Sequence, residues 1–258
     1  MRLMKRILSA AAVLALSASL LVGCSSGTAS SVPVSASSAA ESTVSSVGET
    51  ASSAVDENEA AAAQLLNDLT GSYQELWPVI LADEYKQTWL DDCTALVGED
   101  NAEAAFEKLS SMVTGDVYGE DAVKAYANGG GAYFCGFTNS LAILTFDGET
   151  STISGTDKDG NVLFSHTYHY IGMEPVRGLY EFQSDDADSG EFTYFFLAPD
   201  TSAETYHIEF RYGSDAEALS QYDAGEYAYW LASGISTDCD QTMIDNCIEL
   251  FCTENLAG

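Results

Sequence analysis

The sequence has 258 residues and a formal net charge of −31, from 40 acidic and nine basic side chains. A surface this acidic repels the phosphates of nucleic acids and of anionic lipids, so we expect no nucleic-acid partner. Once the N-terminal segments described below are set aside, about 200 residues remain, which is enough for one domain with a buried core.

The first 23 residues are predicted to be a lipoprotein signal peptide. A basic head (residues 2–6) precedes an apolar run (residues 7–20) that is shorter than the ~20 residues needed to span a bilayer. The run ends in Leu-Val-Gly-Cys at residues 21–24, which matches the bacterial lipobox. The match implies that Cys24 becomes the lipidated first residue of the mature chain, anchored on the extracytoplasmic face of the cell membrane.

Residues 24–56 are predicted to be a disordered tether that follows the lipidated Cys24. They are rich in Ser and Ala and hold no large apolar residue except scattered valines. Such a segment buries too little surface to offset the entropy lost on ordering. The folded domain is therefore expected over residues 57–258.

Apolar residues recur at helical spacing from residue 57 to about residue 113. This pattern predicts helices over 60–69, 73–81 and 102–112. A further apolar stripe predicts a closing helix over 240–254. Helices therefore flank the middle of the domain on both sides in sequence.

After a glycine-rich loop at residues 128–131, apolar and polar residues alternate, which is typical of strands. Seven segments have this pattern: 133–137, 140–147, 150–156, 161–171, 178–184, 192–198 and 204–212. The acidic connectors 157–161 and 185–190 have the chemistry of tight, solvated turns. Consecutive strands joined in this way predict a mainly β (α+β) domain, built as an antiparallel sheet or a small barrel.

Metal-binding side chains are scarce, since the chain has only three histidines. In the predicted strand 204–212, His207 and Glu209 lie on the same polar face, because side chains alternate along a strand. Two ligands are too few for tight zinc binding, which requires three or four. Taken alone, His207 is also compatible with an ordinary polar side chain.

Five cysteines follow Cys24, namely Cys93, Cys135, Cys239, Cys247 and Cys252. An exported domain permits disulfides, and the odd number leaves at least one thiol unpaired. The pairing stays open. No CxxC motif supports a zinc ribbon or a thioredoxin-type site.

The sequence offers no motif for catalysis. It lacks a GxSxG elbow, a GxxxxGK[ST] phosphate loop and a GxGxxG fingerprint. We therefore expect a protein that is not an enzyme.

Several stretches resemble ZinT (YodA-like) zinc-recruitment domains. Residues 69–78, LTGSYQELWP, resemble the opening of those domains, and residues 180–215 resemble their longest signature. Within that signature the matching pairs and residues are Ala198-Pro199, Ala203-Glu204, His207-Ile208 and Gly213. The resemblance covers residues 69–252. It implies a lipocalin/calycin-like antiparallel β-barrel with N-terminal helices and a C-terminal helix, which binds zinc outside the cytoplasm and supports its import, with a metal-import permease complex as partner.

The resemblance also implies where a metal would bind. The family's site resembles three histidines, of which the last matches His207, while the middle one falls on Thr205 and the first on Phe195. A remodelled site would need other donors. The candidate metal ligands are His207, Glu204, Glu209 and His169.

Two hypotheses follow for the function. The first is a binding module in divalent-metal acquisition, with zinc as the ion. The second is a metal-free barrel that binds a small apolar ligand or a protein partner, which the high Phe and Tyr content would suit.

Overall fold

The computed structural model describes residues 47–130, 132–198 and 206–257, with side chains from Glu57 onward. The predicted signal peptide (1–23), the predicted lipidation site Cys24 and the first part of the predicted tether lie outside the described residues. None of the helices in the described part of the chain is long and apolar enough to cross a membrane.

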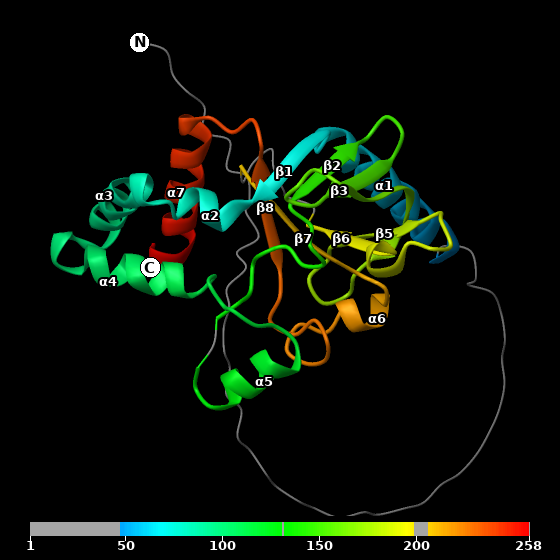
Figure 1. The fold of residues 1–258 in the computed structure, drawn as a ribbon. Helices are drawn as coiled ribbons and strands as arrows, with labels where there is room; N and C mark the ends of the chain where they lie inside the picture. Colours follow the sequence, from blue (N-terminus) through cyan, green and yellow to red (C-terminus); the bar gives the residue numbers. More distant parts are fainter. Residues whose placement is uncertain (1–46, 131, 199–205, 258) are drawn as a thin grey trace, which may run out of the picture. The chain divides into compact units, whose positions relative to one another are not determined.

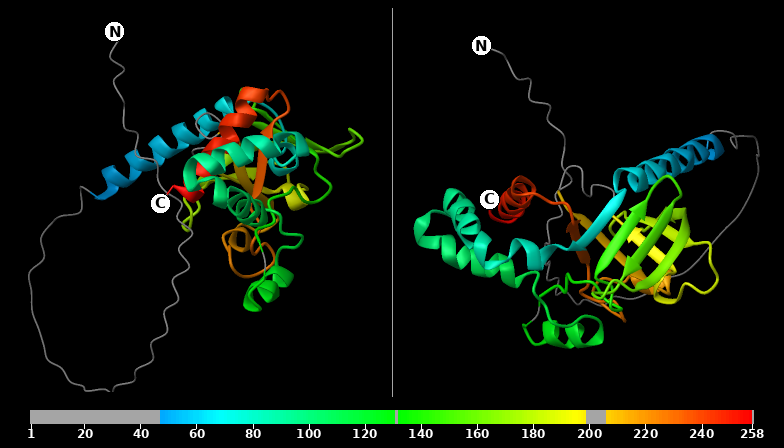
Figure 2. Two further views of the ribbon diagram at one scale, coloured as in Figure 1. Left: turned by 90° about the vertical axis from the view of Figure 1, so that its left-hand side faces the viewer. Right: turned by 45° about the horizontal axis from the view of Figure 1, so that its top comes forward.

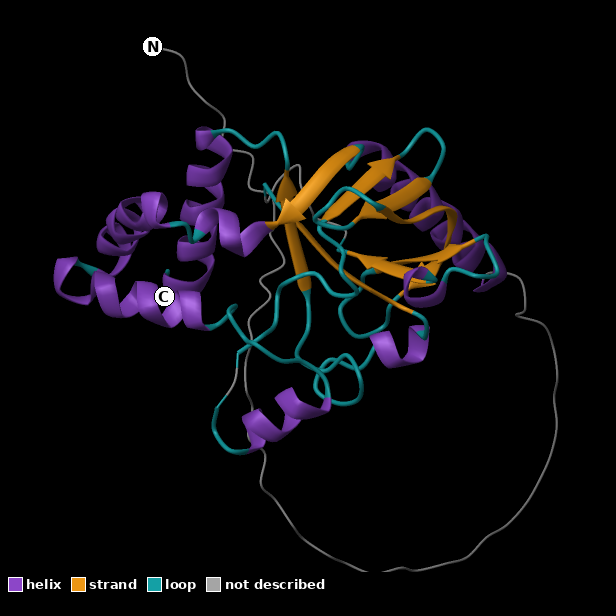
Figure 3. Ribbon diagram, in the orientation of Figure 1, coloured by secondary structure: helices purple, strands orange, loops and turns teal. Residues whose placement is uncertain are grey.

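Eight antiparallel strands close into a barrel in chain order (Figures 1 and 3). They are β1 (Gly71–Glu75), β2 (Ile143–Asp147), β3 (Thr152–Thr156), β4 (Val162–Met173), β5 (Tyr180–Ser184), β6 (Tyr194–Leu197), β7 (Ile208–Gly213) and β8 (Ala232–Ser236). Strand β1 closes the barrel, because Tyr73 pairs with Leu144 of β2 on one side and with Ser236 of β8 on the other. The predicted fold class, an antiparallel β-barrel with flanking helices, is confirmed.

Helices cover the barrel on two sides (Figure 2). They are α1 (Val47–Asp68), α2 (Leu76–Ile80), α3 (Lys86–Val97), α4 (Glu99–Ser111), α5 (Glu120–Ala127), α6 (Ala216–Leu219) and α7 (Gln241–Leu256). Helix α1 buries Leu65 and Leu66 against the barrel core, and Leu69, directly after the helix, is buried there too. Helices α2, α3, α4 and α7 share a second core next to β8, and Asp240 begins α7 by accepting a hydrogen bond from the backbone N–H of Met243.

The inside of the barrel is filled by aromatic rings. Strand alternation directs Phe210 and Tyr212 of β7 inward, where their rings stack on Phe195 of β6. Phe164 and Tyr168 of β4 contact the same phenyl ring. Because all five side chains are buried, they form the packed core of the barrel rather than the wall of an open cavity.

Three elements differ from the sequence-based prediction. Residues 73–81 are not one helix, because β1 ends at Glu75 and α2 begins directly after it. Residues 133–137 form no regular strand, and Phe134 makes only isolated bridges to Thr114 and Trp230. Strand β8, which the sequence did not predict, completes the barrel.

Helix α1 also overlaps the stretch predicted as tether. It begins at Val47, ten residues before the expected start of the domain at residue 57. Alanine is the strongest helix former, so the four alanines at residues 60–63 favour this helix, and its C-terminal half packs on the barrel.

A buried arginine ties β7 to the segment between α6 and β8. Arg211 has no exposed surface, and its guanidinium donates hydrogen bonds to the backbone carbonyls of Leu219, Gln221 and Tyr227. The guanidinium carbon also lies 4.3 Å from the centre of the Tyr222 ring. One side chain thus satisfies three carbonyls that would otherwise be buried in an irregular segment.

We expect Arg211→Met to destabilise the domain by about 3–5 kcal/mol, because it leaves these buried carbonyls without donors while keeping a similar side-chain length. Urea unfolding followed by circular dichroism measures the loss. Lys158→Met is the matched control, since Lys158 pairs only with its exposed neighbour Asp159, and it should change stability by less than about 0.5 kcal/mol. A loss below about 1 kcal/mol for Arg211→Met would contradict this role.

Candidate functional site

The predicted pair His207 and Glu209 is brought together in the structure. His207 lies just before β7, after Tyr206, whose backbone φ of +63° places it in the left-handed region. Since Ile208 and Phe210 point into the barrel, Glu209 points outward. His207 Nε2 and Glu209 Oε1 are 3.7 Å apart, close enough for an ion pair on the outside of the barrel.

Helix α7 places a sulfur atom next to this pair. Cys247 of α7 is buried, and its side chain interacts with the His207 imidazole. The His207 side chain is 17% exposed and that of Glu209 37% exposed, so the pair lies under the helix and still reaches solvent. The Cys247 side chain therefore lies beside the imidazole of the pair, where β7 and α7 come together.

The protonation of the pair follows from its surroundings. Burial alone lowers the pKa of His207, but the Cys247 and Glu209 side chains outweigh this effect and raise the pKa well above its usual value. Burial likewise raises the pKa of Glu209, but His207 and the more distant Arg177 lower it below its usual value. Both shifts favour a charged imidazolium beside a charged carboxylate.

The other predicted ligands lie elsewhere. His169 points outward from β4, and its Nδ1 is 2.6 Å from Asp185 Oδ1. Strands β5 and β6 separate β4 from β7, so His169 does not join His207. Glu204 lies outside the described residues. The remaining histidine, His166, pairs with Asp186 at 2.7 Å.

The position at which the sequence resemblance placed a first metal ligand is part of the barrel core. Phe195 has no exposed surface and packs inside the barrel, whereas His207 lies outside it under α7. Thr205, at the middle position, lies outside the described residues. The phenyl ring and the imidazole are therefore on opposite sides of the barrel wall, and a histidine at 195 would not face His207.

The described residues hold no complete metal site. Within 47–130, 132–198 and 206–257, no three His, Cys, Asp or Glu side chains are gathered so that they could hold a metal ion. His207 and Glu209 supply two donors that fit zinc chemistry, and a closed site needs two more.

Sequence reasoning missed Cys247 as a neighbour of the pair. Its position on the apolar stripe of the closing helix predicted a core residue, and the structure confirms that burial. Its contact with His207 depends on how α7 packs against β7, and no local pattern encodes that packing.

Comparisons with known proteins give structural matches only. No family model matches the chain, and no curated protein sequence does so. The structure is similar to the Zn(II)-bound ZinT-like domain of Streptococcus pneumoniae AdcA, with 15% identity and a TM-score of 0.45 over 71% of this chain and 89% of that one.

A second match is to Zn(II)-bound AdcA from Streptococcus pneumoniae, with 14% identity and a TM-score of 0.42. It covers 75% of this chain and 35% of that protein, so the chain spans about a third of its length. The Zn(II) belongs to those proteins, and neither match is close enough to transfer a site to this chain.

The coupled pair predicts a pH-dependent stability. Because the pKa of His207 is raised, its contribution is complete below its ordinary value of 6.5 and is lost as the pH rises through the folded-state pKa. Because the pKa of Glu209 is lowered, its contribution is complete above its ordinary value of 4.5 and is lost as the pH falls through the folded-state pKa. The pair therefore stabilises the domain most between pH 4.5 and 6.5.

Glu209→Gln should lower the melting temperature most within that window, and the difference from the wild type should shrink as the pH rises above it. Melting curves in EDTA from pH 4 to 9 measure this. The exposed acid Glu217 provides the control, and Glu217→Gln should show no such window. A difference that is constant across the whole pH range would rule out the ion pair.

Proposed function

We propose that this chain is a lipid-anchored, extracytoplasmic protein that binds a divalent metal ion, zinc, weakly and reversibly at His207 and Glu209. The observation that carries the proposal is the 3.7 Å pair of an imidazole nitrogen and a carboxylate oxygen under α7, with the Cys247 thiol beside the imidazole. Imidazole and thiolate are the donors that zinc selects. Zinc would have to displace the proton that the raised pKa of His207 retains, which keeps binding weak and makes it stronger at higher pH.

The small number of donors sets the strength of binding. Structural zinc sites are closed by four protein ligands, whereas the described residues supply two, with a thiol next to them. Such a site exchanges its ion readily, which suits a protein that collects metal and passes it on. Glu204 remains the proposed further oxygen donor, and the acidic surface would raise the local concentration of cations.

The anchor and partner belong to the same proposal. Lipidation of Cys24 would hold the domain at the outer face of the membrane, where a metal-import permease complex would receive the ion. The basic head, the apolar run and the lipobox match at residues 21–24 support this placement. The proposed role is binding and delivery, without catalysis.

The packing of the barrel bears on the metal-free alternative. A lipocalin-type ligand occupies the inside of a barrel, but here Phe195, Phe210 and Tyr212 stack in that space without exposed surface. No observation therefore favours an apolar ligand in the barrel interior.

Calorimetric zinc titration of the full chain, purified without a His tag, tests the proposal. We expect one weak site, with affinity reduced about tenfold or more in His207→Ala and also reduced in Glu209→Gln and Glu204→Gln, because each change removes a donor. His169→Ala is the matched control and should bind like the wild type, since that imidazole lies on another strand with Asp185.

Two results would contradict this function. One is a wild-type chain that takes up no zinc, and the other is zinc binding that His207→Ala leaves unchanged. Binding that is lost in His169→Ala instead would move the site to β4.

A further inference from the structure

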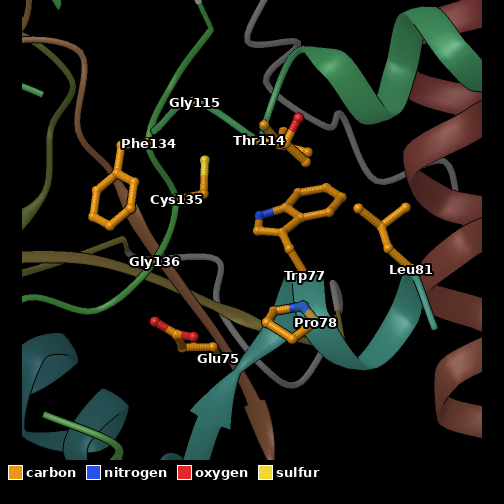
Figure 4. Close-up of a pocket in the computed structure, with 10 residues that line it drawn as sticks. Glu75, Trp77, Pro78, Leu81, Thr114, Gly115, Phe134, Cys135 and Gly136 are labelled. Carbon is orange, nitrogen blue, oxygen red and sulfur yellow. The ribbon is translucent and has the colours of Figure 1, made fainter. Parts of the chain in front are cut away.

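A cavity of about 320 Å³ lies outside the barrel, beside the start of α2 (Figure 4). Its walls come from three parts of the chain that are distant in sequence: Trp77 and Leu81 at α2, Val113 after α4, and Phe134 and Cys135 in the segment that bridges to Trp230. The volume lies within the range of small-molecule sites, and an engineered cavity of about 150 Å³ already holds benzene.

The cavity contains a buried hydrogen-bond donor that has no acceptor. Trp77 is 9% exposed, and no group in the described part of the chain accepts a hydrogen bond from its Nε1. Figure 4 shows this nitrogen turned toward Cys135 and Phe134. The Cys135 sulfur interacts with the ring nitrogen, but sulfur is a weak acceptor and the contact does not meet hydrogen-bond geometry. Since buried donors are nearly always paired, this one requires an explanation.

In the other two tryptophans the indole N–H is paired with a backbone carbonyl. Trp89 Nε1 donates to the Ile80 carbonyl at 2.7 Å, and Trp230 Nε1 donates to the Gly136 carbonyl at 2.9 Å. Trp77 is also held firmly, because its ring packs edge-on against Phe251 with the centroids 4.8 Å apart. The unpaired N–H therefore belongs to a fixed ring at the wall of a cavity.

The remaining wall chemistry restricts the ligand. No Lys or Arg lines the cavity, and the chain is strongly acidic, so an anion would be repelled. One oxygen of the Glu75 carboxylate, Oε1, accepts a hydrogen bond from the backbone N–H of Phe137 at 2.6 Å. Burial raises the pKa of the Cys135 thiol to about 12, so the thiol is uncharged at neutral pH. The rest of the lining is mainly apolar.

We propose that this cavity binds a small uncharged ring compound whose carbonyl or ether oxygen accepts a hydrogen bond from Trp77 Nε1. The apolar walls bury the ring, and the indole N–H fixes its orientation and selects for the oxygen. The site is separate from the His207–Glu209 pair and does not require metal.

Two isosteric probes test the hydrogen bond. Acetophenone carries a carbonyl oxygen, and α-methylstyrene has the same shape with a methylene group in its place. Isothermal titration calorimetry of the full chain in EDTA should show acetophenone binding about tenfold tighter or more, because only the ketone satisfies the buried donor. In Trp77→Phe the two probes should bind equally.

Matched variants separate the site from general effects. Trp89→Phe removes an indole whose N–H is already paired outside the cavity and should keep the preference for the ketone. Val113→Trp should fill the cavity and abolish binding of both probes, whereas Val162→Trp, on an exposed hairpin, should not. His207→Ala should keep acetophenone binding, so failure of the metal proposal leaves this one intact.

The stability of the free protein gives a second readout. Trp77→Phe removes an unpaired buried donor, so it should cost much less stability in urea than Trp89→Phe, which breaks a hydrogen bond. Equal affinity of the wild type for the two probes, a preference that survives in Trp77→Phe, or binding that survives in Val113→Trp would each overturn the proposal.

Discussion

The pairing of β1 with β8 is the contact on which both candidate sites depend. Gln74 and Glu75 pair with Ile235 and Gly234, and this closes the barrel. A side chain at Gly234 would bring a Cβ within 2.9 Å of Ile208 Cγ1, so only glycine lets β8 lie this close to β7. Because β1 runs straight into α2 and β8 leads to α7, the same closure places the tryptophan at the cavity and the helix that covers the ion pair.

The sequence predicts the barrel better than it predicts its closure. The alternation of apolar and polar residues is clear in β5 and β7, because one face of each strand is buried in the aromatic core, whereas β6 reads Tyr-Phe-Phe-Leu and is apolar throughout. Strand β1 is hidden, since Tyr73 continues the helical spacing of Leu76 and Ile80, which belong to α2. Strand β8 reads Ala-Ser-Gly-Ile-Ser, and its small residues carry almost no alternation even though it is buried on both faces. Small residues are required there because β7, α2 and the segment around Cys135 all approach closely.

The two sites differ in how much of each can be predicted from local sequence patterns. His207 and Glu209 are two residues apart, and strand geometry alone predicts that they share a face. Cys247 reaches the same place through tertiary packing, which no spacing in the sequence encodes. Trp77 shows the limit most clearly: all three tryptophans look alike in sequence, and only the positions of carbonyls around each ring decide which N–H is paired.

Cys135 connects the two sites physically. Its side chain lines the cavity, its carbonyl accepts a hydrogen bond from the backbone N–H of Ser233 in β8, and the Glu209 carboxylate contributes to the raised pKa of its thiol. A cation held by Glu209 would offset the negative charge that acts on the Cys135 thiol. A ligand beside Trp77 would lie on the other side of the Cys135 segment. Any coupling between the two would be reciprocal, since a bound ion changes the affinity for the ligand by the same factor as the ligand changes the affinity for the ion. The proposed ligand and the Cys135 thiol are both uncharged at neutral pH, and the close packing of β8 against this segment leaves little room for the wall to move, so the coupling between the two sites should be small.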